Sequence, residues 1–202
     1  MVINNEYHLS ENNFIKLNTS KTNIVLGNTY SEGLDYYNGW VKRYGGNYKK
    51  TSHYSISKDG VIYNHFDSDY YSKYMDDSQH WESSISILLE NLGNLRETSI
   101  KNVYLTDFNY TYIMNGEPFY QKWRGNYLWD TYTDKQLCSL DKLINMLCIK
   151  HNINKKISSD NIYNKEYLNK LDGIYYKSNL NEYCLDLSPS WDFKNFKGKY
   201  ER

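Results

Sequence analysis

The sequence has little cysteine, and what it has follows no metal-binding pattern. Its 3 cysteines in 202 residues, Cys138, Cys148 and Cys184, are odd in number and are not spaced as zinc ligands are. Cys138 and Cys148 fall within one expected helix, where they cannot form a disulfide with each other. These features argue against a disulfide framework, and we expect reduced thiols.

Net charge, a long apolar run and a leader sequence are also missing. Lys plus Arg and Asp plus Glu number 24 each, so no overall field attracts nucleic acid or a membrane surface. No apolar run approaches the roughly 20 residues that a membrane-spanning helix needs. Residues 1–6 have neither the basic nor the apolar region of a secretory signal. We therefore expect a soluble protein without nucleic-acid or membrane partners.

Tyrosine, by contrast, is abundant, with 23 in the chain. Its side chain combines a large apolar ring with a polar hydroxyl, which suits protein contact surfaces and carbohydrate-binding grooves. A codon bias in an AT-rich genome explains the same abundance equally well. Composition alone leaves both explanations open.

The apolar pattern predicts one α/β domain over residues 21–202, preceded by a polar arm at residues 1–20. In chain order we expect a strand at 22–26, a helix at 31–44, a β-hairpin at 52–63 and a strand at 84–89. Residues 92–131 show little periodicity and are expected to be loops with one or two short strands. Residues 152–172 are expected to be a loop with a short helix at about 165–171.

The clearest local signal begins at Thr133. The sequence Thr133-Asp134-Lys135-Gln136 is a capping box, in which the Thr133 and Gln136 side chains satisfy backbone N–H groups reciprocally. An apolar stripe follows at helical spacing, through Leu140 and Leu147. A long amphipathic helix is therefore predicted to start here.

Five sequence blocks, taken in order, carry a resemblance across residues 21–196. They are the strand ending in Gly27-Asn28-Thr29; the hairpin with His53 and the turn Lys58-Asp59-Gly60; the strand at 84–89 that runs into Asn91-Leu92-Gly93; the stretch from Trp129 to Gln136; and the closing block at 186–193. Together they resemble the zinc-dependent N-acetylmuramoyl-L-alanine amidases, which cleave peptidoglycan, and in particular the bacteriophage-type members. The resemblance implies a central mixed β-sheet flanked by helices.

The same resemblance implies that most metal-binding and catalytic side chains are replaced. The three ligand positions correspond to Gly27, to Ile174 and to Asp186, or to Ser188 if the closing block is aligned on its proline. Glycine and isoleucine cannot coordinate zinc, and one carboxylate does not hold it against water.

The catalytic positions are altered in the same way. Leu88 stands at the general-base position and cannot accept a proton. Ser52 replaces a frequent tyrosine, while His53 matches a mostly structural position. We expect no catalytic residue, no metal and no cofactor.

Some residues could still form an active site at a different position in the cleft. A relocated active site would draw on Glu90, Asp186, Cys184 and His53, although each has a structural interpretation that we favour. The remaining histidines, His8, His65, His80 and His151, are interpreted as surface residues. Five tyrosines could line the cleft that would hold the active site in the amidase family, although we favour half-buried structural roles for them. They are Tyr70, Tyr71, Tyr74, Tyr175 and Tyr176.

Three functions remain in competition. The favoured one is a catalytically inactive amidase-like domain that serves as a structural or interaction protein in a bacteriophage virion, at the tail or tail tip, with other virion or assembly proteins as partners. The second is a non-catalytic module that binds peptidoglycan. The third is an active cell-wall amidase with the relocated site.

Overall fold

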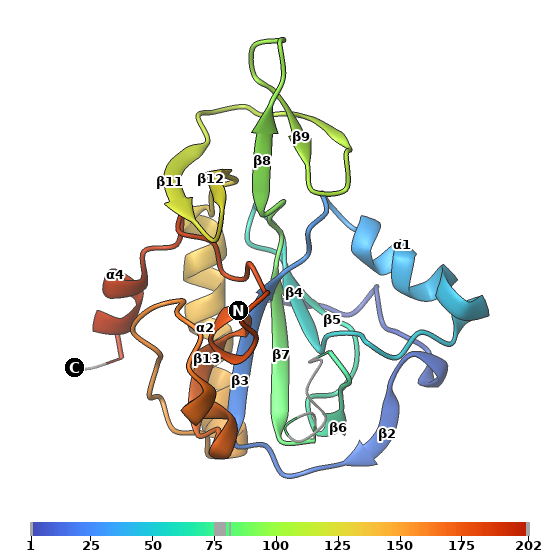
Figure 1. The fold of residues 1–202 in the computed structure, drawn as a ribbon. Coiled ribbons are helices and arrows are strands. Elements are labelled where there is room, and N and C mark those ends of the chain that lie inside the picture. Colours follow the sequence, from blue (N-terminus) through green and yellow to red (C-terminus); the bar gives the residue numbers. More distant parts are fainter. Residues whose placement is uncertain (1, 75–79, 81, 201–202) are drawn as a thin grey trace.

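A six-stranded mixed β-sheet forms the centre of the molecule. The structure, a computed structural model, describes residues 2–74, 80 and 82–200 (Figure 1). In sheet order the strands are β1 (Ile3–Asn4), β5 (Ile62–Asn64), β4 (Tyr54–Ile56), β7 (Ser84–Leu89), β3 (Asn23–Asn28) and β13 (Gly173–Tyr176). All neighbouring pairs are parallel except β4 and β5, which form the predicted hairpin. The expected central mixed sheet is confirmed.

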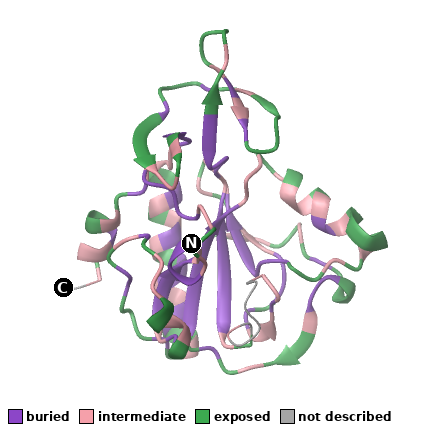
Figure 2. Ribbon diagram, viewed as in Figure 1, coloured by how far each residue is buried: buried purple, intermediate pink, exposed green. Residues whose placement is uncertain are grey.

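Strands β3 and β7 are neighbouring inner strands of this sheet and are buried along their whole length (Figure 2). Their runs of apolar residues fit strands that are covered on both faces. On one face, Ile24 and Leu26 of β3 pack with Ile85 of β7 against helix α2 (Asp134–His151). The opposite face carries Leu88, which packs with Trp40 of helix α1 (Asp35–Lys42).

Helix α2 begins as the capping box predicts. The Thr133 hydroxyl accepts a hydrogen bond from the Gln136 amide at 3.2 Å, and the Gln136 side-chain oxygen accepts one from the Thr133 amide at 3.0 Å. The Gln136 side-chain amide also donates to the Glu90 carbonyl, at 2.8 Å, just beyond the end of β7. The cap therefore fixes the start of the helix against the central sheet.

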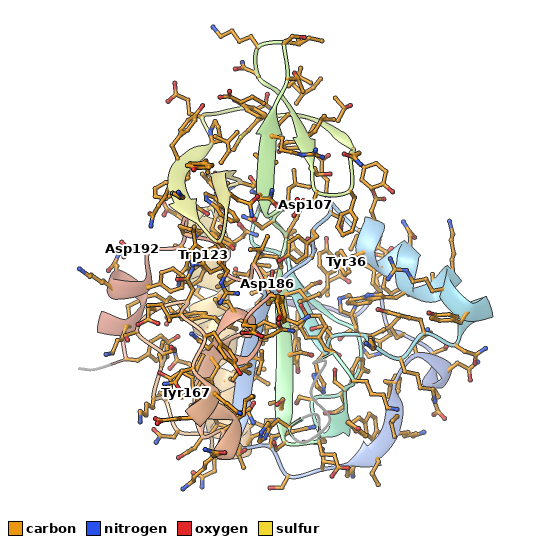
Figure 3. The ribbon with its side chains drawn as sticks, in the orientation of Figure 1. Tyr36, Asp107, Trp123, Tyr167, Asp186 and Asp192 are labelled. Carbon is orange, nitrogen blue, oxygen red and sulfur yellow. The ribbon has the colours of Figure 1, made fainter. Side chains whose placement is uncertain are left out.

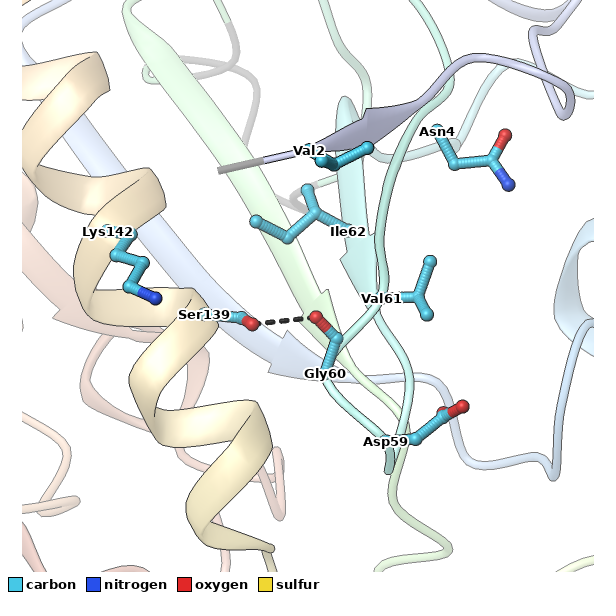
Figure 4. A pocket seen from close by; sticks show the side chains of 8 residues that line it. All are labelled: Val2, Asn4, Asp59, Gly60, Val61, Ile62, Ser139 and Lys142. Carbon is cyan, nitrogen blue, oxygen red and sulfur yellow. Dashed lines mark hydrogen bonds between the residues drawn. The ribbon is translucent and has the colours of Figure 1, made fainter.

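The hairpin turn depends on Gly60, which has a φ of +85°. A Cβ atom at this position would lie 2.8 Å from the Lys135 carbonyl oxygen, so only glycine lets the turn approach the first turn of α2 this closely. The Ser139 hydroxyl, one helical turn further on, donates to the Gly60 carbonyl at 2.6 Å (Figure 4). The predicted Asp59-Gly60 turn is confirmed.

Residues 92–131 form a second sheet, so the prediction of loops with one or two strands is wrong. Its five strands, in sheet order, are β10 (Thr111–Ile113), β9 (Val103–Thr106), β8 (Asn94–Glu97), β12 (Asn126–Trp129) and β11 (Phe119–Trp123). All pairs are antiparallel, and the outer strands are largely exposed (Figures 1 and 2). Short strands with so little buried surface leave a weak apolar pattern, which explains the error.

The N-terminal residues pack onto the central domain. Strand β1 pairs with β5 at the sheet edge, Phe14 stacks on Phe66 with ring centroids 4.7 Å apart, and β2 (Ile15–Asn18) pairs with β6 (Tyr70–Tyr71). The division at residue 20 stays a prediction. Short helical segments complete the fold: η1 (Glu11–Asn13), η2 (Arg43–Gly46), η3 (Lys165–Asn169), α3 (Lys177–Leu180) and α4 (Phe193–Gly198). None of the helices in the described residues is long and apolar enough to cross a membrane.

A buried carboxylate joins the two sheets. Both oxygens of Asp130, which directly follows β12, accept hydrogen bonds from the Lys58 ammonium at 2.8 Å. The same carboxylate accepts the backbone amides of Leu92 at 2.9 Å and Thr131 at 2.8 Å, while the Asp130 carbonyl accepts the Ser190 hydroxyl at 2.7 Å. Asp130 thus connects the hairpin turn, the β7–β8 junction, the start of α2 and the C-terminal block.

We expect Asp130→Ala to lower the free energy of unfolding by about 3–5 kcal/mol, because it leaves a partly buried ammonium and two backbone amides without their acceptor. Asp67→Ala is the matched control, since the side chains of the Asp67–Lys150 pair are 53% and 41% exposed, and exposed ion pairs contribute less than about 1 kcal/mol. Urea unfolding of both variants checks this. Equal losses would show that Asp130 is no more important than a surface carboxylate.

Candidate functional site

The candidate site lies on the face of the central sheet opposite α2. Gly27 of β3 pairs directly with Leu88 of β7, so two of the positions implied by the family resemblance are neighbours. Asp186, from the segment after α3, lies over them near the middle of the molecule (Figure 3). The structure therefore brings Gly27, Leu88 and Asp186 together.

The space in front of Gly27 is already filled. A Cβ atom built on Gly27 would lie 2.5 Å from the Tyr74 hydroxyl oxygen, 2.9 Å from Asp186 Oδ2 and 3.3 Å from a Leu88 methyl carbon. Real Cβ atoms do not approach other atoms at the first two distances. Consequently a ligating side chain at position 27 would need both Tyr74 and Asp186 to move.

Asp186 is fully buried, and within the described residues neither carboxylate oxygen has a hydrogen-bond partner of normal distance and angle. Burial raises the pKa of the Asp186 carboxyl above its ordinary value. The positive charge of Lys177, together with weaker polar contacts from Tyr30, the Asn28 backbone amide and Cys184, lowers that pKa only in part. In these surroundings the charged form of the Asp186 carboxyl group is disfavoured.

Lys177 is a site residue that the sequence did not reveal. Strand β13 pairs with β3 in the register Ile174 with Ile24 and Tyr176 with Leu26, so Lys177 follows at the level of Gly27. The Lys177 ammonium lies 4.4 Å from the centroid of the Tyr74 ring, within range of a cation–π interaction. The Lys177 charge also lowers the pKa of the buried Asp186 carboxyl, so Lys177 contributes to the electrostatics of the site.

Ile174, the expected second ligand position, is not part of this group. It lies three residues before the level of Gly27 and packs with Ile24 and Leu26 in the core under α2. Because successive side chains of a strand point to opposite faces, Ile174 and Gly27 belong to different sides of the sheet. The structure does not bring Ile174 to the candidate site.

His53 and Ser52 have structural roles. The buried His53 ring accepts a hydrogen bond at Nδ1 from the Ser86 amide, at 3.0 Å, so Nε2 carries the proton that is donated to the Tyr70 carbonyl, at 3.0 Å. Burial, aided by the Lys21 charge, lowers the pKa of His53 to about 3, which keeps the ring neutral. The Ser52 hydroxyl donates to the Ser86 carbonyl at 2.8 Å.

The interpretation of all four remaining histidines as surface residues is wrong for His151, whose side chain is only 7% exposed, and for His65. The His65 ring is fully buried, and burial lowers its pKa to about 4. Nδ1 lies 2.9 Å from the Tyr7 carbonyl, so it donates there, and Nε2 accepts from the Ser55 hydroxyl at 2.8 Å. Ser55 also contacts the Tyr36 hydroxyl of α1. No local sequence signal marks His65, since these partners come from distant segments.

The residues of the relocated-site alternative are occupied elsewhere. Glu90 accepts the backbone amides of Gly33 at 2.8 Å and Lys58 at 2.9 Å. Burial raises the pKa of the Cys184 thiol, which disfavours the reactive thiolate. Across residues 2–74, 80 and 82–200, no three His, Cys, Asp or Glu side chains lie close enough together to hold a metal ion.

Of the five tyrosines proposed to line the cleft, Tyr74 reaches the site at Gly27. Tyr176 is buried in the core against Phe193, with ring centroids 4.9 Å apart, and Tyr175 packs against Tyr167 at 5.1 Å. Tyr70 and Tyr71 form strand β6. The structural roles favoured for Tyr175 and Tyr176 are confirmed.

An amidase of the family suggested by the sequence would hold zinc here, but the residues present do not fit the ion. Tyr74 fills the position in front of Gly27, Leu88 presents methyl groups, and Asp186 has a raised pKa beside the ammonium of Lys177. A catalytic zinc needs about three N, O or S ligands and an open position for water. This arrangement offers neither and includes no base at position 88 that could activate a water molecule.

A cavity of about 690 Å³ lies next to the closed site, between α1 and the second sheet. Tyr36 and Trp40 of α1 line one wall, and Phe108 and Tyr110 of the β9–β10 connection line the other. Glu32, Asp35 and Arg43 add charge to the lining. A second surface pocket, of about 450 Å³, lies at the far sheet edge between β1, the hairpin turn and α2 and shares no lining residue with the site (Figure 4).

Comparison with solved structures identifies the fold. The N-acetylmuramoyl-L-alanine amidase LysC from Clostridium intestinale URNW is 16% identical, with a TM-score of 0.56, and the match covers 99% of this chain and 96% of that chain. The endolysin N-acetylmuramoyl-L-alanine amidase LysCS from the same organism is 16% identical, with a TM-score of 0.57 and coverage of 99% and 94%. No protein-family model matches the sequence, and a search of curated proteins finds no match.

A recognition protein has a similar structure. The ectodomain complex of the peptidoglycan recognition proteins LCa and LCx, bound to tracheal cytotoxin, is 12% identical, with a TM-score of 0.50 and coverage of 94% of this chain and 92% of that chain. At these identities the likeness concerns the fold. The chain therefore has the α/β fold shared by N-acetylmuramoyl-L-alanine amidases and peptidoglycan recognition proteins, as the five sequence blocks predicted.

We expect Gly27→Ala to lower the free energy of unfolding by about 1–3 kcal/mol, because the added methyl group overpacks the filled site. Gly39→Ala, within α1, is the control: its Cβ would meet only Arg43 Nε at 4.0 Å, so we expect a gain of up to about 1 kcal/mol from helix propensity. Tyr74→Phe combined with Gly27→Ala should recover part of the loss. A neutral Gly27→Ala, measured by urea unfolding, would mean that the site has room for a side chain.

Proposed function

We propose that this chain is a catalytically inactive amidase-like domain that acts as a structural or interaction protein. The observation that supports this most directly is the filled space at Gly27, where the Tyr74 hydroxyl and the Asp186 carboxylate occupy the volume of a side chain. A ligating side chain at this position would require the Tyr74 and Asp186 side chains to move, and Asp186 is fully buried.

The electrostatics of the site support the same proposal. Hydrolysis of an amide by a zinc amidase depends on a metal-bound water and a base that accepts its proton. Here a lysine supplies the positive charge beside Asp186, and a leucine occupies the position expected for the base. A fixed ammonium has no open coordination position, so it does not activate water as zinc does.

We propose a bacteriophage virion, at the tail or its tip, as the setting of this domain. The support is the resemblance of the block from Trp129 to Gln136 to bacteriophage-type amidases, together with the fold shared with the endolysin LysCS. Virion and assembly proteins are the partners in this proposal. Exposed aromatic side chains on the second sheet, such as Phe108 and Tyr120, offer contact surface for them.

A second candidate is a non-catalytic module that binds peptidoglycan. The cavity between α1 and the second sheet favours it, because the aromatic residues Tyr36, Trp40 and Tyr110 are among its lining and aromatic side chains can pack against sugar rings. The similar fold of LCa and LCx, whose complex holds tracheal cytotoxin, supports retention of a binding role without the site chemistry.

Zinc analysis of the purified protein, combined with dye release from labelled peptidoglycan, tests the inactive assignment. We expect substoichiometric zinc and no dye release, in the presence or absence of added zinc. The Asp186→Ala variant should contain the same trace of zinc as the parent, because Asp186 is not a ligand. Stoichiometric zinc that disappears in the variant, or hydrolysis by folded protein, would contradict the proposal.

Two further measurements separate the two candidates. A virion protein should be detected by mass spectrometry in washed phage particles and should remain in the supernatant when mixed with purified cell walls. A peptidoglycan-binding module should sediment with the walls, and Tyr110→Ala, which changes an exposed residue of the cavity lining, should reduce that sedimentation. Absence from washed particles would remove the virion setting.

A further inference from the structure

A surface formed by residues 42–50 carries only positive charge. Between Asp35 and Asp59 the sequence contains five basic residues and no acidic one, and four of the five fall within 42–50. The whole chain has 24 basic and 24 acidic residues, so the rest of it carries four more acidic than basic residues. The positive charge is therefore concentrated at the C-terminal end of α1 and in the segment that follows.

This surface is hollowed into a pocket of about 430 Å³ that no part of the proposed function uses. The side chains that line it are basic, aromatic or amide, and none is acidic: Arg43, Tyr44, Asn47, Tyr48, Lys49 and Lys50. Among the described residues, neither Arg43 nor Lys49 forms an ion pair. Both cations are thus available to an anionic group.

The aromatic part of the pocket is ordered. The Tyr44 and Tyr48 rings stack with centroids 6.0 Å apart and an interplanar angle of 22°, and the Arg43 guanidinium carbon lies 5.2 Å from the Tyr48 centroid. Tyr44 nevertheless remains 79% exposed. A ring held by stacking and still open to solvent can pack against a ligand at little cost in side-chain entropy.

A buried asparagine side chain fixes the conformation of the loop that carries the pocket. The Asn13 side chain, 2% exposed, donates to the Gly46 carbonyl at 3.1 Å and to the Tyr48 carbonyl at 3.2 Å. The Asn47 backbone amide closes the turn by donating to the Tyr44 carbonyl at 3.3 Å. The loop conformation therefore exists before any ligand binds, which lowers the entropic cost of binding.

We infer that this pocket binds a sugar that carries a phosphate group. Guanidinium and ammonium groups form charge-assisted hydrogen bonds with phosphate oxygens, and tyrosine ring faces pack against the C–H surface of a sugar. A nucleic acid strand would need a longer basic track, because it carries a phosphate on every nucleotide. The six-residue pocket, on a chain whose remainder is acidic, fits one or two phosphates.

NMR titration of the full-length, 15N-labelled protein with N-acetylglucosamine 6-phosphate tests this inference. We expect shifts of the Gly45, Gly46 and Lys49 amide signals. Binding should be at least about tenfold tighter than for N-acetylglucosamine or for inorganic phosphate, since each of these provides only half of the contacts. Affinity for either of them equal to that of the phosphosugar would overturn the inference.

Charge reversal localises the site. Lys49→Glu should weaken phosphosugar binding by about tenfold or more, because it replaces a charge-assisted hydrogen bond with repulsion. Lys122→Glu is the control: it makes the same charge change at a lysine outside the pocket, which lies 5.5 Å from the Tyr127 ring centroid on the second sheet. Equal effects of the two substitutions, or tighter binding of a single-stranded oligonucleotide than of the phosphosugar, would contradict the inference.

Discussion

The buried carboxylate of Asp130 is the constraint on which the relation between the two sheets depends. A carboxylate in the interior is stable only when its oxygens are fully hydrogen-bonded, and Asp130 meets this condition with Lys58 and the amides of Leu92 and Thr131. Each donor comes from a different connection of the fold. Losing any of them leaves a buried polar group unpaired, so the hairpin turn, the second sheet and the start of α2 are held in one arrangement.

The site at Gly27 is stabilised by the packing of the side chains that fill it. Removing a ligand would leave a cavity, and cavities destabilise a core. Here the Tyr74 hydroxyl reaches into the space at Gly27, and Leu88 adds apolar surface where the family resemblance implies a carboxylate. The position of the Tyr74 hydroxyl depends on the glycine at position 27, because a larger residue there would displace it. Packing in the cleft therefore stabilises the fold where coordination bonds are lacking.

The sequence predicts the parts of the fold that have strong local signals. The fully buried strands β3 and β7 have short, mostly apolar sequences, and α2 begins with a capping box. The sequence therefore predicts all three elements. The second sheet was missed because its outer strands, such as β11, are mostly exposed and irregular. In the site, the family resemblance implies that Gly27 and Leu88 lie close together, and the structure pairs them on neighbouring strands. Ile174 was misplaced and Lys177 missed, because strand register depends on contacts between distant segments.

Lys177 has a consequence for the conditions under which this domain keeps its structure. A metal ion in a cleft is in equilibrium with the surrounding solution, so its occupancy varies with metal supply, chelators and pH. The ammonium beside Asp186 is covalently attached to the chain and cannot dissociate. For the inactive domain proposed above, the charge in the cleft would therefore not depend on the zinc content of the medium.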